Sequence, residues 1–97
     1  MTNEEIWNIG LEERTDELSK LQSEYDRLDV ECRKAEFEKD MYARLRDVNN
    51  AMLYKQKFSE KYEKCARASE KLPKQKNALE NEISVLKKEI YYINSLM

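Results

Sequence analysis

The sequence predicts an all-α protein built from long amphipathic helices that pair as an antiparallel coiled coil. Of its 97 residues, 39% are charged and 40% are hydrophobic. There is one glycine and one proline, so few loops are expected, and such a composition is typical of long helices. Apolar side chains recur at alternating spacings of three and four residues, which is the period of one helix face. The large hydrophobic fraction also argues against disorder.

A first helical arm is expected over residues 3–46. Thr2 and Glu5 have the spacing of a capping box, which marks a helix start near residue 3. We expect the helix to continue through Gly10, because the apolar series resumes in phase at Leu11. With Leu18 at heptad position a, the frame also places Trp7 and Ala35 at d. The predicted core residues of this arm are Leu11, Leu18, Leu21, Tyr25, Leu28 and Cys32.

A second helical arm is expected over residues 51–96. The heptad frame keeps the same phase before and after Pro73, which predicts a kink in the helix at this residue and not a loop. The frames of the two arms differ by two residues, since the first has an a position at Arg46 and the second at Val48. This difference and the Asp and Asn residues there predict a turn at 47–50, within one domain spanning 1–97. The predicted core residues of this arm are Phe58, Tyr62, Cys65, Leu72, Leu79, Ile83, Leu86, Ile90 and Ile93.

Charge determines the expected direction of pairing. Every g position from residue 17 to 38 is glutamate, so a parallel homodimer would set Glu24 against Asp29 and would be repelled. In antiparallel pairing, residue i of one arm can face residue 97 minus i of the other, so that the two facing residue numbers total 97. This alignment brings the apolar layers of the two arms together. It also places Cys32 against Cys65, so mild oxidation should crosslink them. Pairings displaced by one heptad also place a positions against d positions.

Other pairings of the arms stay open at this level. An antiparallel dimer of unbroken helices satisfies the same layer rule as a hairpin, although the frame difference favours the hairpin. A parallel or mixed coiled coil, completed by a different protein with a basic helix, is a further alternative. In that arrangement the partner's basic residues would neutralise the glutamate row.

Apolar residues outside the heptad core gather at the middle and at both termini of the chain. Helices that are apolar on more than one side are buried on more than one side, so we expect further helices to pack there. Those helices would come from a second copy or from another protein. The predicted partner interface comprises Ile6, Trp7, Ile9, Met41, Leu45, Met52, Leu53, Tyr54, Tyr91, Tyr92 and Leu96.

Catalytic, metal and cofactor sites are not expected. The chain has no histidine, its two cysteines lack metal-ligand spacing, and its single glycine excludes most phosphate-binding loops. General acid–base chemistry would rest on carboxylates and lysines of solvated helix faces. The sequence therefore predicts that the protein is not an enzyme.

Charge and hydropathy bound the partners and the location. Residues 1–50 carry 14 acidic and 8 basic side chains, whereas residues 51–97 carry 6 and 10, giving net charges of −6 and +4. The basic segment 54–76 suggests nucleic acid or another anionic polymer as an alternative partner. Neutralisation of the acidic arm explains it more simply, so nucleic-acid binding is not favoured. With no signal peptide and no apolar run of 18 residues, we expect no membrane span and an intracellular protein, cytoplasmic or nuclear.

The function expected from these features is structural. A non-catalytic scaffold or adaptor would present a rigid coiled-coil rod and join protein partners within a multi-subunit complex by helix–helix packing. Its partners would be other protein helices, through self-association or a hetero-complex.

Overall fold

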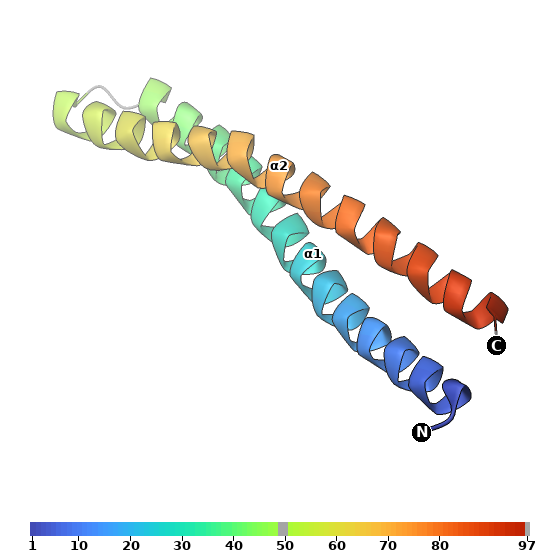
Figure 1. Ribbon diagram of the computed structural model, residues 1–97. Coiled ribbons are helices and arrows are strands. Elements are labelled where there is room, and N and C mark those ends of the chain that lie inside the picture. The colour runs from blue at the N-terminus through green and yellow to red at the C-terminus, as the bar shows by residue number, and fades with distance from the viewer. Residues whose placement is uncertain (49–50, 97) are drawn as a thin grey trace. The chain divides into compact units, whose positions relative to one another are not determined.

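The protein folds into two long α-helices. The computed structural model describes residues 1–48 and 51–96, and these contain α1 (Asn3–Val48), α2 (Met52–Leu96) and no strand (Figure 1). The all-α prediction of two long pairing helices is confirmed. Asp47 and Val48 of the predicted turn belong to the last turn of α1, whereas Asn49 and Asn50 lie outside the described residues.

The start of α1 follows from its capping residue. The backbone N–H of Glu5 donates to Thr2 Oγ1 at 3.2 Å, which satisfies one of the N–H groups that lack an intrahelical partner. Glu4 and Glu5 also lie in the first turn, where negative charge is favoured by the helix dipole. Gly10 is helical, as expected, and its carbonyl accepts a hydrogen bond from Arg14 Nη1 at 3.2 Å.

The proline of α2 lies inside the helix. Pro73 has no backbone N–H to donate, yet the residues on both sides of it are helical. The half-buried positions of α2 keep their three- and four-residue spacing across it, from Phe58 to Ile93. The kink expected at this point stays a prediction.

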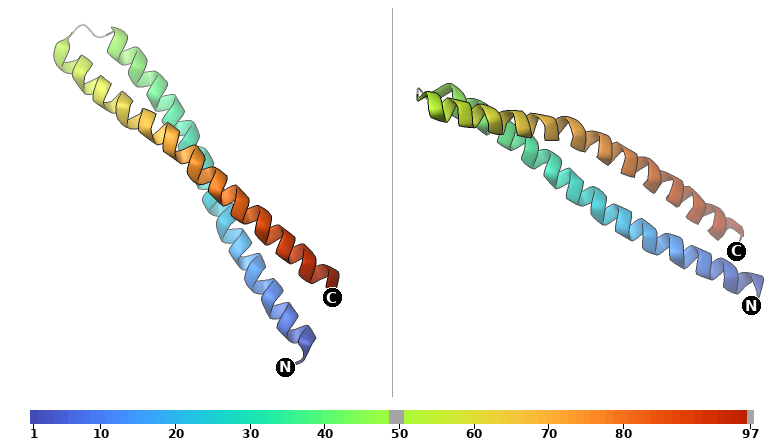
Figure 2. Two further views of the ribbon diagram at one scale, coloured as in Figure 1. Left: turned by 45° about the horizontal axis from the view of Figure 1, so that its top comes forward. Right: turned by 60° about the vertical axis from the view of Figure 1, so that its left-hand side comes forward.

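The chain divides into two compact units. The terminal unit contains Met1–Arg27 and Asn77–Met97, and the central unit contains Leu28–Lys76. In each unit a segment of α1 packs antiparallel against a segment of α2. Within the central unit, the green segment of α1 and the yellow segment of α2 can be followed side by side in Figure 2.

The core of the terminal unit is aliphatic. Ile83 and Leu86 of α2 are buried, with 7% and 8% of their surface exposed. Burial of such side chains stabilises a helix pair by about 1.5–3 kcal/mol each. Arg14 Nε contacts Glu89 Oε2 across the unit at 3.1 Å.

The core of the central unit combines small, aromatic and charged side chains. Leu28 and Ala35 of α1 are its buried residues, at 4% and 7% exposure. The rings of Tyr42 and Phe58 stack across the helix pair with centroids 6.3 Å apart. Two cations lie over aromatic rings: the Arg46 guanidinium is 5.0 Å from the Tyr62 centroid, and the Lys61 ammonium is 5.4 Å from that of Tyr42.

The pairing register differs from the predicted one by about a heptad. Facing residue numbers total 103 for Arg14 with Glu89 in the terminal unit. In the central unit they total 105 for Asp29 with Lys76 and 103 for Glu38 with Cys65, against the predicted 97. Core positions recur every seven residues, so totals of 97 and 104 match a with d equally well. The sequence pattern alone therefore could not choose between them.

The predicted contact between the cysteines is consequently wrong for this pairing. Cys65 lies against Glu38, and Cys32 is six residues from Glu38 along α1, which is about 9 Å at 1.5 Å per residue. Both cysteines are free thiols. A disulfide within the hairpin would require one helix to slide along the other.

The two-residue difference between the heptad frames also has a different origin from the expected one. In α1 the half-buried positions keep the first frame as far as Arg46, whereas Val48 is 76% exposed. The first frame thus continues to the last turn of α1, and the second one belongs wholly to α2. The frame does not change within a helix.

Candidate protein-binding surfaces

The predicted core residues lie on the least exposed face of each helix. Two helices cover such a face from one side, so most of these side chains keep part of their surface open. Leu28, Ile83 and Leu86 are buried, whereas Leu11, Leu18, Leu21, Tyr25, Cys32, Phe58, Tyr62, Cys65, Leu72, Leu79, Ile90 and Ile93 are half-buried. Additional protein could therefore cover further apolar surface along the pair.

The predicted interface residues of the central unit are exposed at the start of α2 and half-buried on α1. Met52, Leu53 and Tyr54 begin α2 and are 83%, 75% and 51% exposed. Met41 and Leu45 of α1 are half-buried. We call Met52, Leu53 and Tyr54 the α2-start patch.

The predicted interface residues of the terminal unit are also mostly exposed. Ile6 and Ile9 of α1 are exposed, and so are Tyr91, Tyr92 and Leu96 of α2, the last three at 76%, 64% and 50%. Trp7 is half-buried and lines a hollow together with Leu96. We call Tyr91, Tyr92 and Leu96 the α2-end patch.

A further apolar row on α1 was missed by the sequence reasoning. Val30, Phe37 and Val48 are 64%, 68% and 76% exposed, and half-buried Met41 lies between them. Spacings of seven, four and seven residues place these four on one side of a helix, opposite buried Leu28 and Ala35. The sequence signal that could have revealed this row is the helical spacing of these apolar residues outside the heptad core positions. Of these four residues, Met41 alone belongs to the predicted partner interface.

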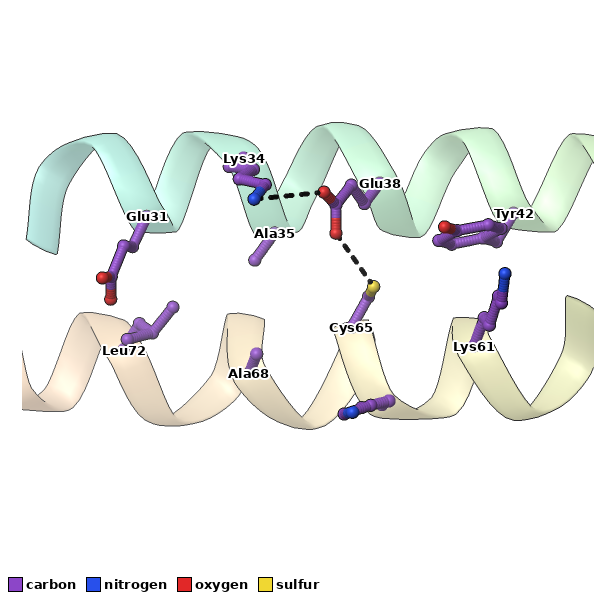
Figure 3. Close-up of a pocket in the computed structure, with 10 residues that line it drawn as sticks. Glu31, Lys34, Ala35, Glu38, Tyr42, Lys61, Cys65, Ala68 and Leu72 are labelled. Carbon is purple, nitrogen blue, oxygen red and sulfur yellow. Dashed lines mark hydrogen bonds and ion pairs between the residues drawn. The ribbon is translucent and has the colours of Figure 1, made fainter.

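The central unit carries a groove between α1 and α2 (Figure 3). Its open volume is about 440 Å³, and Ala35, Cys65, Ala68 and Leu72 form its floor. The two alanines leave the groove hollow because their side chains are too short to fill it. Its remaining lining residues are Glu31, Lys34, Glu38 and Tyr42 from α1, with Lys61 and Lys64 from α2.

The thiol on the groove floor is tuned by its surroundings. Cys65 Sγ donates to Glu38 Oε2 at 3.7 Å, while Glu38 Oε1 lies 3.7 Å from Lys34 Nζ (Figure 3). Burial raises the pKa of the Cys65 thiol, and the negative charge of Glu38 raises it further. The thiol is therefore held in its protonated form, which is a poor nucleophile.

A cross-helix ion pair closes the central unit at its far end from the α2-start patch. Lys76 Nζ lies 2.5 Å from Asp29 Oδ1, and both side chains are about three-quarters covered. The hydrogen bond from Lys76, together with the charge of Arg33, lowers the pKa of the Asp29 carboxyl below its ordinary value of 3.8. Lys76 is a charged residue at a heptad core position, and the carboxylate of Asp29 neutralises its charge.

The basic segment 54–76 is not one uniform surface. Lys76 pairs with Asp29, Lys61 lies over the Tyr42 ring, and Arg67 contacts Glu63 at 3.8 Å. Lys57, Lys61, Lys64 and Lys71 recur on one side of α2, next to the groove. Part of the positive charge is therefore used within the fold.

Metal-binding clusters and membrane-spanning helices are absent from residues 1–48 and 51–96. No three His, Cys, Asp or Glu side chains are grouped there so that they could hold a metal ion. Neither helix contains, in its described length, a stretch long and apolar enough to cross a bilayer. No protein-family model, curated protein or solved structure matches the chain.

Proposed function

We propose that this chain is a non-catalytic structural or adaptor protein that joins partner proteins by helix–helix packing. The observation that carries the proposal is the exposure of large apolar side chains in two separate places, the α2-start patch and the α2-end patch. Grouped exposed apolar residues on a small protein mark interaction sites. Tyr54, Tyr91 and Tyr92 add the residue type that is enriched among binding hot spots.

The partner that fits such surfaces is an amphipathic helix. Its apolar residues would recur at spacings of three and four, and would pack against the apolar rows that the two helices leave open. Burying a Leu or Met side chain at such an interface contributes about 1.5–3 kcal/mol before the cost of association. The long helices would serve to keep the docking patches at fixed positions along each unit.

We further propose that the protein acts inside the cell. Its two cysteines are free thiols, although a small protein of an oxidising compartment commonly relies on disulfides. The free thiols support a reducing environment.

Substitutions in the two patches test the adaptor function. Leu53→Ser with Tyr54→Ser, and separately Tyr91→Ser with Tyr92→Ser, should each release tagged protein from its native complex, seen as a later elution on gel filtration of cell extract. The matched control, Glu60→Ser with Lys74→Ser, changes exposed polar residues of the same helix and should leave elution unchanged.

Two outcomes would contradict the proposal. One is a wild-type chain that elutes alone. The other is a complex that survives both double substitutions but disperses with nuclease or rising salt, which would point to an anionic polymer bound through residues 54–76.

A further inference from the structure

The groove of the central unit is an incompletely covered core. Ala35 and Ala68 leave space between the helices, and Cys65 and Leu72 beside them are half-buried. The groove runs along the pair, since its lining extends over about three turns of α1, from Glu31 to Tyr42. Packing of two further helices over such a surface is the arrangement of a four-helix bundle.

The two edges of the groove carry opposite charge. Along α1 the edge has Glu31 and Glu38, with Lys34 as its one cation, so its net charge is −1. Along α2 the edge has Lys61 and Lys64, with a net charge of +2. In the same row of α2, outside the groove lining, stand Lys57 and Lys71.

Opposite edges make this surface complementary to itself. A copy rotated about a two-fold axis that runs along the groove sets its basic edge on the acidic edge of the first copy, and symmetry repeats the contact. An axis across the groove would instead set acidic edge on acidic edge, with a repulsive cost. The charges therefore select one orientation, in which the α1 helices of both copies point the same way.

We propose that a second copy of this chain docks on the groove of the central unit, acidic edge on basic edge, and forms a symmetric dimer. Ala35, Cys65, Ala68 and Leu72 would be its apolar centre. This interface is separate from the α2-start and α2-end patches, so it stands or falls independently of the adaptor function proposed for them.

Paired charge reversals test the dimer and its orientation by sedimentation equilibrium. Wild-type protein should show a mass of twice 11.7 kDa. Glu31→Lys with Glu38→Lys makes both edges basic, and Lys61→Glu with Lys64→Glu makes both acidic. Each variant alone should dimerise at least about tenfold more weakly, whereas an equimolar mixture should recover a dimer, because every edge again meets its opposite.

A matched control places the same charge change elsewhere. Arg67→Glu with Lys74→Glu reverses two exposed cations of α2 that do not line the groove. The dimer dissociation constant of this variant should stay within about twofold of the wild type, a difference of well under 1 kcal/mol. A loss equal to that of Lys61→Glu with Lys64→Glu would show that net charge alone governs association, and would overturn the proposal.

A measurement on the unaltered sequence guards against variants that fail to fold. A mixture of ¹⁴N- and ¹⁵N-labelled wild-type chains, treated with a zero-length reagent that joins carboxylates to amines, should yield mixed-isotope products between Glu31 or Glu38 and Lys61 or Lys64. A wild-type chain that stays at 11.7 kDa up to about 1 mM would overturn the proposal. So would mixed-isotope products that join other surfaces only.

Discussion

The terminal and central units share one heptad pattern, yet different side chains hold them. The terminal unit buries Ile83 and Leu86, two large aliphatic residues of α2. The central unit buries Leu28 and the much smaller Ala35, and adds ring stacking, two cation–aromatic contacts and the Asp29–Lys76 pair. Alternating spacings of three and four residues therefore fix which face is covered and leave open how it is stabilised.

This difference has a functional side. The groove of the central unit is lined by small residues such as Ala35 and Ala68, whereas the hollows of the terminal unit are lined by larger aliphatic residues, Ile83 in one and Leu86 in another.

The largest expected effect comes from truncating a buried leucine in each unit. Leu86→Ala and Leu28→Ala should each lower the free energy of unfolding by about 2–3 kcal/mol, because both remove packed methyl groups and leave a cavity. Hydrogen exchange followed by mass spectrometry would locate the damage. We expect faster exchange over 1–27 and 77–96 for Leu86→Ala, and over 28–76 for Leu28→Ala.

Uniform exchange in both variants would break the comparison. It would mean that the two units unfold together as one cooperative structure. Val85→Ala is a control, since Val85 is 55% exposed in the same helix as Leu86 and its truncation should change stability by less than about 0.5 kcal/mol.

The next largest effect concerns the aromatic contacts of the central unit. Tyr42→Leu keeps an apolar side chain but removes the ring that stacks on Phe58 and lies beneath Lys61. Urea denaturation should show a loss of about 1 kcal/mol. Tyr91→Leu in the terminal unit, where the ring is 76% exposed, should leave the midpoint nearly unchanged. Equal losses in both variants would remove the distinction between the units.

A smaller effect should follow from the acid sensitivity of the Asp29–Lys76 pair. Because the pKa of Asp29 is lower in the folded protein than in the unfolded chain, the pair's contribution is present above the ordinary value of 3.8. It is lost as the pH falls from there through the folded pKa. The melting temperature, followed by circular dichroism, should fall less between pH 5 and pH 2 in Asp29→Asn than in the wild type, and an identical fall would contradict this assignment.

The smallest effect is chemical. Glu38→Gln removes the negative charge beside Cys65 and should lower the pKa of the thiol, so alkylation by iodoacetamide should reach its half-maximal rate at a lower pH. A Cys32→Ser background leaves Cys65 as the reacting thiol. Glu60→Gln, exposed on the same helix as Cys65, serves as the control. An unchanged pH profile in Glu38→Gln would show that burial alone protects this thiol.

The register shows where sequence reasoning reached its limit. The a and d positions were assigned from local spacing, and the structure places them on the covered side of both helices, as at Leu28 and Leu86. The partner of each position was predicted with facing numbers totalling 97, whereas the numbers of the residues joined by cross-helix hydrogen bonds total 103 to 105. Arg14 and Lys76 are polar residues at heptad core positions, and in the observed register they pair with the acidic residues Glu89 and Asp29.

What the sequence by itself determined is local. The helix period and the capping at Thr2 depend on residues within a turn or two of one another, so they can be found in the sequence. The scarcity of Gly and Pro, which leaves the helices uninterrupted, can also be counted there.

What only the tertiary structure decided is the sliding position of one helix on the other. That position sets which residues face Cys65, and it forms the groove by bringing Ala35 near Ala68. A heptad pattern repeats every seven residues, so it assigns nearly equal apolar burial to several such positions. The choice among them depends on contacts between residues far apart in the chain, such as Asp29 with Lys76.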